Sequence, residues 1–203
     1  TFWVGKEGAT IVSMKGYVND EPGYETMELM ENSVLYVLEK KKLKRAWAQI
    51  HLDRLKNNIE KCRSLLKEPT ELMCVVKANC YGHGTEKIIP FLQDEAGIDW
   101  FAVSNLIEAQ ELRDLGVSGE ILILGYTPPE NAPELVKYDI IQAVTELEYA
   151  KKLAKHCPVN KSVRVHLAFD TGMSRIGIST TDISVACDEA QAIYRLERIE
   201  AEG

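Results

Sequence analysis

The stretch "LMCVVKANCYGHG", residues 72–84, joins a strand-like apolar run to a lysine, a tyrosine and two glycines. Val75 and Val76 are typical of a buried β-strand, which normally excludes a charged side chain such as that of Lys77. Gly82 and Gly84 then interrupt the run. A lysine at the carboxyl end of a buried strand either reaches solvent at a rim or takes part in chemistry.

Outward from this stretch, strand-like and helix-like segments alternate from about residue 45 to the end of the chain. The pattern predicts strands at residues 45–53, 72–79, 100–105, 120–126, 140–144, 162–170 and 198–203. It predicts helices at residues 54–67, 85–97, 107–116, 129–139, 147–157 and 181–197. Short apolar strands that alternate with helices indicate βαβ units and a parallel sheet.

Two parallel architectures fit this alternation, a doubly wound sheet and a (β/α)8 barrel. No G-x-G-x-x-G pattern follows the first strand, which weakens the dinucleotide-binding version of the doubly wound sheet. Distinctive residues instead follow two of the strands, at 77–81 and 170–175, where barrel enzymes carry their chemistry. Because a whole barrel needs roughly 250 residues, the sequence predicts an α/β fold that is part of a (β/α)8 barrel, with about half of the barrel from Leu72 onward.

Composition restricts the function classes. The chain has 203 residues and a formal net charge of -7, which argues against a general nucleic-acid binder. It shows no apolar run of membrane-spanning length and no signal peptide, so we expect a cytoplasmic protein without a membrane partner. The odd number of cysteines indicates reduced thiols rather than a disulfide framework or a metal site: Cys62, Cys74, Cys80, Cys157 and Cys187.

Lys77 has two interpretations on position alone. It is either a rim lysine, with its ammonium in water, or an amine that condenses with a carbonyl compound to form an imine. The second interpretation gains from its surroundings, because the N-terminus of the helix that follows could hold a phosphate, with Tyr81 and the glycine backbone nearby. A lysine beside a phosphate site is what pyridoxal phosphate requires.

A second constellation is "DTGMSRIG", residues 170–177, where a strand ends at Asp170 and the chain turns at Gly172. It is either an ordinary loop with a surface arginine, or a loop that presents Arg175 to the same edge of the sheet as Lys77. A planar guanidinium at that edge suits a substrate carboxylate or an oxygen anion on a cofactor ring.

With both motifs in this order, the sequence resembles the N-terminal part of the alanine racemase family. "RAWAQIHLDRLKNNI" and "WFAVSNLIEAQELRDLG" resemble further segments of that family, and the resemblance runs from about Arg45 to Gly203. It implies that Lys77 holds pyridoxal 5'-phosphate covalently and acts as a catalytic base. It also implies that Tyr81 contacts the cofactor phosphate, and that Arg175 lies near the phenolic oxygen and the substrate carboxylate.

The resemblance further implies a homodimeric isomerase that interconverts L- and D-alanine by two-base proton transfer and supplies D-alanine for peptidoglycan. The second base would be a tyrosine of the partner subunit. Many family members carry a carbamylated lysine where this chain has Ala168, so the anchor of Arg175 differs here. We expect the chain to be part of a longer protein, and we expect a structural role for His83. Alanine and serine both stay open as substrates.

Residues 1–44 read differently, as short strands with glycine turns followed by the basic run "EKKKLKR". We predict a β-rich N-terminal segment, with a domain boundary near residue 44. Residues 21–43 resemble the end of the β-roll sensor domain of Crp/Fnr-type regulators. Two alternatives to a racemase therefore remain: a ligand-sensing module fused to a racemase fragment, and a non-catalytic protein that binds pyridoxal phosphate.

Overall fold

The computed structural model describes residues 49–203, and residues 50–203 form one compact unit. The predicted β-rich segment and the sensor-like stretch lie outside the described residues, and the boundary near residue 44 stays a prediction. Six parallel strands form one sheet in the order β1-β2-β3-β4-β5-β8. These strands are β1 Met73–Val75, β2 Trp100–Val103, β3 Glu120–Ile123, β4 Ile141–Val144, β5 Val163–Leu167 and β8 Ile199–Ala201.

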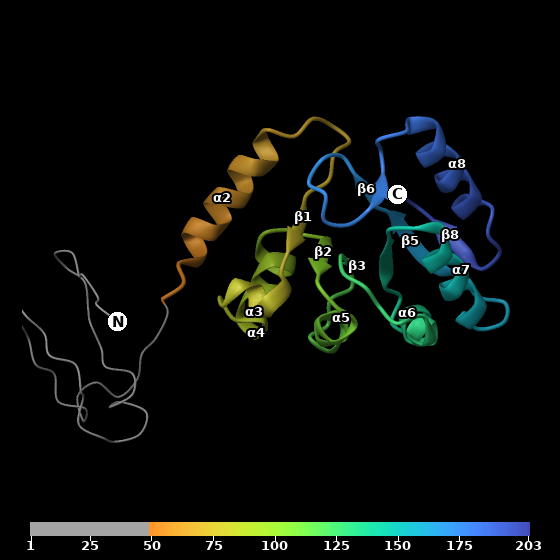
Figure 1. Cartoon of the computed structure of the whole chain (residues 1–203). Coiled ribbons are helices and arrows are strands. Elements are labelled where there is room, and N and C mark those ends of the chain that lie inside the picture. The colour runs from red at the N-terminus through yellow and green to blue at the C-terminus, as the bar shows by residue number, and fades with distance from the viewer. Residues whose placement is uncertain (1–48) are drawn as a thin grey trace, which may run out of the picture. The chain divides into compact units, whose positions relative to one another are not determined.

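Helices connect these strands and follow one another along the sheet (Figure 1). The order of the strands follows the chain, so each βα unit adds a strand beside the previous one, as in a (β/α)8 barrel. The predicted α/β partial barrel is therefore confirmed. The helical segments are α2 Leu52–Ser64, α3 Lys77–Tyr81, α4 Thr85–Pro90, η1 Phe91–Glu95, α5 Leu106–Asp114, η2 Pro129–Asn131, α6 Ala132–Lys137, α7 Leu147–His156 and α8 Ile183–Tyr194.

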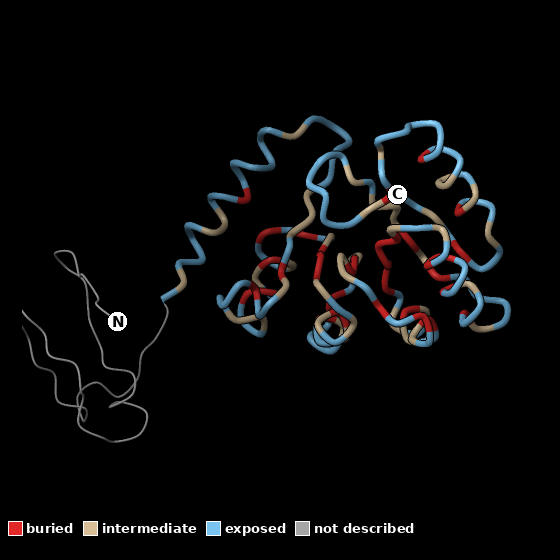
Figure 2. The backbone as a smooth tube through the Cα atoms, in the orientation of Figure 1, coloured by how far each residue is buried: buried red, intermediate tan, exposed pale blue. Residues whose placement is uncertain are grey.

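The sheet has an apolar core on each face. Alternate residues of a strand point to opposite faces, and in β2 Phe101 belongs to the large core between sheet and helices. Its neighbour Ala102 joins Leu122, Ile141 and Ala143 in a smaller cluster on the other face. Buried residues therefore concentrate along the strands and on the sheet-facing sides of the helices (Figure 2). Burial on both faces explains why the central strands β2, β3 and β4 are nearly continuous apolar runs.

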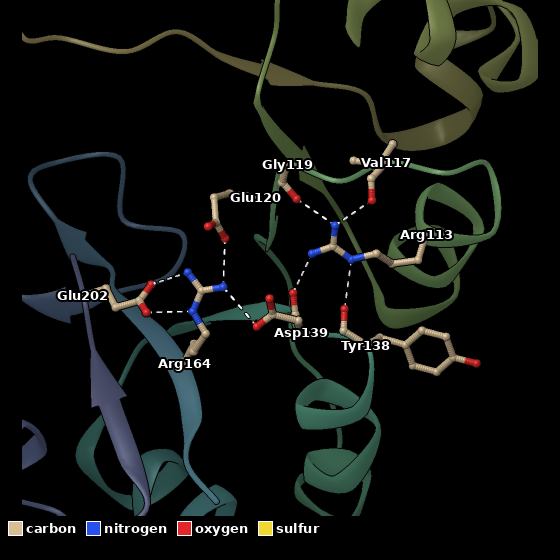
Figure 3. Close-up of polar contacts among 8 residues, drawn as sticks. All are labelled: Arg113, Val117, Gly119, Glu120, Tyr138, Asp139, Arg164 and Glu202. Atoms are coloured by element: carbon tan, nitrogen blue, oxygen red, sulfur yellow. Dashed lines mark hydrogen bonds and ion pairs between the residues drawn. The ribbon is translucent and has the colours of Figure 1, made fainter.

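Two arginines tie the connections at the amino ends of β3, β4 and β5 (Figure 3). The Arg113 guanidinium donates to four backbone carbonyls, those of Val117, Gly119, Tyr138 and Asp139, at 2.7 to 2.9 Å. Burial lowers the pKa of Arg113, because withdrawing the guanidinium from water disfavours its charged form.

The Arg164 guanidinium on β5 pairs with carboxylates from three other segments. It bonds Glu202 in a bidentate manner, at 2.6 and 2.9 Å, and contacts Glu120 at 2.8 Å and Asp139 at 3.1 Å. The hydrogen bonds with Glu202 raise the pKa of Arg164 above its ordinary value. The pair of arginines fixes the amino edge of the sheet and leaves the opposite, carboxyl edge to the loops that carry Lys77 and Arg175.

The predicted strand at 72–79 ends at Val75, before the turn that carries Lys77, and three further predicted elements differ from the structure. Within the described part of the predicted strand at 45–53, Gln49 to His51 form no strand and α2 already begins at Leu52. Ile59 on α2 is buried in the core. The apolar residues near it recur with helical spacing, so this segment forms a helix despite the strand-like alternation of its first residues.

The predicted helix at 85–97 is two segments, α4 and the π-helical η1, because Pro90 has no N–H to donate to the carbonyl one turn earlier. The Ala96 N–H then bonds the Phe91 carbonyl at 3.0 Å, one residue further than in an α-helix. The third difference, a break at Ala168 in the predicted strand at 162–170, belongs to the loop that carries Arg175 and is described with it.

Candidate active site

Lys77 lies where β1 leaves the sheet. The Val76 N–H bonds the Ala102 carbonyl at 2.8 Å, so the sheet continues one residue past β1. Lys77 follows and is half-buried. The next four residues, 78–81, all have positive φ angles between 52° and 55° and form a left-handed turn of non-glycine residues. At about 1–2 kcal/mol per residue, this conformation costs on the order of 4–8 kcal/mol, so the surrounding structure must hold it in place.

The turn is held from inside and from the side. Cys80 is buried in the core, and its N–H bonds the Val76 carbonyl at 3.0 Å. Burial raises the pKa of the Cys80 thiol, so it stays a neutral core group. The Asn79 side-chain oxygen accepts the Thr85 N–H at 2.7 Å and the Thr85 hydroxyl at 3.0 Å. These contacts tie the turn to the start of α4.

The same contacts occupy most of the donors at the helix N-terminus that we predicted could hold a phosphate, and so count against an anion site there. The N–H groups of residues 82 to 85 all have acceptors within the turn: those of Gly82, His83 and Gly84 bond carbonyls of residues 78 to 80, and that of Thr85 bonds Asn79. The helix behind them has only six residues. His83 serves the turn as well, with its Nδ1 at 2.9 Å from the Cys80 carbonyl oxygen, which is the structural role we expected.

Tyr81 ends the left-handed turn with its side chain 61% exposed. The Lys77 ammonium nitrogen lies 6.0 Å from the centroid of the Tyr81 ring, so the amine and the phenol share one local environment. The Tyr81 hydroxyl is a donor that this turn can offer to an anionic ligand near Lys77.

Arg175 lies in a loop whose base is pinned by two short strands, β6 Phe169–Asp170 and β7 Ile178–Ser179. The predicted strand at 162–170 breaks because Ala168 changes partners: its N–H bonds the Val144 carbonyl, while its carbonyl accepts the Ile178 N–H. Gly177 has a φ of +125°, and a Cβ there would lie 2.6 Å from the Asp170 nitrogen. Only glycine fits this crossing of two backbone segments.

Asp170 organises the tip of this loop. Its carboxylate accepts the N–H groups of Gly172 at 3.0 Å and Ser174 at 2.9 Å, and these bonds hold the Asp170 pKa below its usual range. Arg175 itself is exposed, and within residues 49–203 its guanidinium makes no hydrogen bond or ion pair. Lys77 and Tyr81 thus share one turn, whereas Arg175 comes from another loop at the same edge of the sheet.

Glu108 is a site residue that the sequence reasoning missed. Its carboxylate accepts the Ala78 N–H at 2.9 Å, and the N–H and hydroxyl of Ser104 at 2.8 Å each. Burial raises the pKa of Glu108, but these hydrogen bonds and the Lys77 charge outweigh burial and leave the pKa below its usual value. The sequence does contain a pattern that points to Glu108. Asn105 caps α5 and Glu108 stands three residues later, which is the spacing of a capping box.

Tyr149 holds another loop at the carboxyl edge. Its hydroxyl donates to the Thr127 carbonyl at 2.8 Å and accepts the Thr127 N–H at 3.2 Å. Burial raises the pKa of Tyr149 to about 12, so this phenol is a structural donor.

Among residues 49–203, no three His, Cys, Asp or Glu side chains group as metal ligands, and no helix is long and apolar enough to cross a bilayer.

The fold and the site define a class: a β/α-barrel domain that brings an amine, a phenol and a guanidinium to the edge where barrel enzymes carry their sites. Comparison with known sequences is specific within that class. The family model described as "Alanine racemase, N-terminal domain" matches residues 50–203, and the chain belongs to this family.

Individual relatives agree with this assignment. The chain is 46% identical over 132 residues to the alanine racemase of Clostridium perfringens (strain ATCC 13124), a match that covers 64% of this chain and 34% of that protein. The solved alanine racemase of Clostridium difficile 630 is 37% identical with a TM-score of 0.66, over 75% of this chain and 40% of that one. A histidine racemase from Leuconostoc mesenteroides is 30% identical with a TM-score of 0.62, over 73% and 39%. The chain spans about a third of the length of the curated relatives it matches.

Proposed function

We propose that this chain supplies the lysine-bearing half of a pyridoxal-phosphate-dependent amino-acid racemase that acts on alanine. The observation that carries the proposal is the half-buried Lys77, fixed at the carboxyl end of β1 by a strained turn that also presents Tyr81. The side chains fit the cofactor, because a primary amine condenses with its aldehyde while a phenol and a guanidinium donate to anionic oxygens. The 46% identity to an alanine racemase supports the substrate.

Each residue then has a task. Lys77 would hold the cofactor through its amine and would move a proton at the Cα atom of the amino acid. The Tyr81 hydroxyl donates to the phosphate, and Arg175 binds the substrate carboxylate or the phenolic oxygen. When bound, the cofactor supplies an electron-withdrawing ring that stabilises negative charge at Cα.

Racemisation needs a second base on the opposite face of Cα. Tyr149 does not meet this need, because it is buried, bonded to Thr127 and has a pKa of about 12. We therefore propose that the second base is a tyrosine of a partner subunit, which makes the active form a homodimer. With its product entering peptidoglycan, the enzyme would work in the cytoplasm.

A second candidate keeps the chemistry and changes the substrate. The similarity to a histidine racemase shows that this half of the barrel is compatible with a different amino acid in a related protein. The residues described here act on parts common to all amino acids, the carboxylate and the Cα hydrogen, and so do not select the side chain.

The test is covalent capture followed by a substrate panel. The protein is mixed with pyridoxal phosphate, reduced with borohydride and digested, and the adduct is located by mass spectrometry. We expect the adduct on Lys77 and its loss in Lys77→Ala, while Lys87→Ala, which removes an exposed lysine from α4, keeps it. An adduct that is spread over surface lysines would contradict the proposal. Chiral chromatography of L-alanine, L-serine and L-histidine incubations then ranks the substrates.

A further inference from the structure

One acidic side chain connects the end of β2 to the turn that follows Lys77. Glu108 lies in the first turn of α5 and is partly buried. One of its carboxylate oxygens accepts the Ala78 N–H, and the other accepts both donors of Ser104, all within 2.8 to 2.9 Å. Three donors from two neighbouring βα units therefore converge on one carboxylate.

The Ala78 N–H belongs to the peptide that joins Lys77 to Ala78. Because a peptide unit is planar, an acceptor fixed on its N–H also fixes its carbonyl and the ψ angle of Lys77. Ala78 is also the first residue with positive φ, so the strained turn begins at the atom that Glu108 holds. The direction in which the Lys77 side chain leaves the backbone thus depends on Glu108.

We propose that Glu108 is a positioning residue that clamps the Lys77–Ala78 peptide against the end of β2 and thereby aims the Lys77 amine. The inference rests on the proposed function for what Lys77 does. The clamp itself is a property of the backbone and is measurable without cofactor or substrate.

The chemistry of the carboxylate suggests the variant to use. Both oxygens of Glu108 accept hydrogen bonds, whereas a glutamine of the same shape offers one acceptor and turns its NH2 group toward a donor. Glu108→Gln therefore loses either the Ala78 bond or the Ser104 N–H bond, and in both orientations the Ala78 N–H no longer has a charged acceptor. Glu111→Gln is the matched control, because Glu111 lies on the same helix, is exposed and makes no side-chain hydrogen bond within residues 49–203.

The first measurement is amide hydrogen exchange at Ala78 by NMR, without cofactor. A hydrogen bond to a charged acceptor corresponds to an exchange rate about 10- to 100-fold slower, so Glu108→Gln should exchange faster at Ala78 by such a factor. Glu111→Gln should match the parent, and the amides of β3 should be unchanged in both variants. An unchanged Ala78 rate in Glu108→Gln overturns the proposal.

The second measurement is the initial rate at which borohydride-fixed pyridoxal phosphate accumulates on Lys77. We expect at least a fivefold decrease in Glu108→Gln and none in Glu111→Gln. Faster exchange at Ala78 together with parent-rate capture would show that Glu108 holds the peptide without aiming Lys77, and would overturn the proposal. If the parent itself places no adduct on Lys77, the proposed function fails, while the exchange data still decide whether the clamp exists.

Loss of folding in Glu108→Gln would be seen as fast exchange in β3. Ser104→Ala then carries the test, because it removes the hydroxyl, which donates to Glu108 and accepts from Asn105 at 3.3 Å, and leaves the other two bonds of the carboxylate. It should loosen Glu108 and speed exchange at Ala78 by a smaller factor. A Ser104→Ala protein that folds and exchanges at the parent rate would overturn the clamp in that case.

Discussion

Replacing Arg113 by methionine tests how the amino edge of the barrel is held together. Methionine keeps the length of the apolar stem and removes the guanidinium, which leaves four carbonyls without their donor. Three of these bonds are partly buried and one, to the Asp139 carbonyl, is exposed. With about 1 kcal/mol for each partly buried carbonyl and little for the exposed one, the free energy of unfolding should fall by about 3 kcal/mol.

The planar geometry of the Arg113 guanidinium should matter more for stability than its charge. Arg113→Lys keeps the charge, but a single ammonium cannot reach acceptors on both sides of the connection, so we expect it to recover less than half of the loss. Lys137→Met is the matched control. It removes an exposed cation whose 3.6 Å pair with Glu134 lies at the surface, and should leave the free energy of unfolding close to that of the parent.

Urea denaturation followed by far-UV circular dichroism at neutral pH measures all three variants against the parent. An Arg113→Met protein within 1 kcal/mol of the parent would refute the reasoning, since it would show that water replaces the guanidinium at these carbonyls without cost. An Arg113→Lys protein as stable as the parent would refute the argument from geometry, because a single positive charge would then be enough to stabilise these carbonyls.

Three further predictions concern the carboxyl edge. Gly177→Ala should destabilise the protein by about 2–4 kcal/mol through positive φ and a backbone clash, and Gly172→Ala, with φ +133° and open space, by only about 1–2 kcal/mol; equal losses in urea unfolding would exclude the clash. Glu108 has a lowered pKa, so it contributes stability above about pH 4.5 that is lost as the pH falls through its folded pKa. Thermal unfolding from pH 6 to pH 3 should therefore weaken the parent more than Glu108→Gln, and parallel curves would contradict this. Ala168→Lys should change the melting temperature by less than about 4 °C, because Ala168 is only partly buried; a loss of folding would show a site packed for a small side chain.

The parallel sheet could be predicted from the sequence because β1 to β4 are short, mostly apolar runs, β5 alternates apolar and polar residues, and most connecting helices have apolar faces of the right period. Local chemistry set the limits of that prediction. At Pro90 one missing N–H divides a helix whose apolar spacing is continuous. At Ala168 the strand pattern is unbroken, yet the chain changes partners there, because the pairing of Ile178 with Ala168 is decided by a contact ten residues away.

Around the site, the order of residues predicted which side chains share an edge but not how the backbone between them is folded. Nothing in "KANCY" announces a left-handed turn, since none of its residues is a glycine. The sequence predicts an anion site at the helix N-terminus because it does not show that Asn79 and the turn carbonyls use most of the donors there. Glu108 carried a capping-box signal, but its bond to Ala78 spans 30 residues and depends on the register of β1 against β2.

The left-handed turn has a stereochemical consequence. Its four φ angles are those that D-amino acids prefer. The backbone at 78–81 therefore consists of L-residues in a conformation that favours D-residues. A semisynthetic chain with D-alanine at position 78 would keep the same N–H direction toward Glu108 and release strain that the natural residue stores. If the proposed function is correct, the product of the enzyme would then be the building block that suits the backbone beside its own lysine.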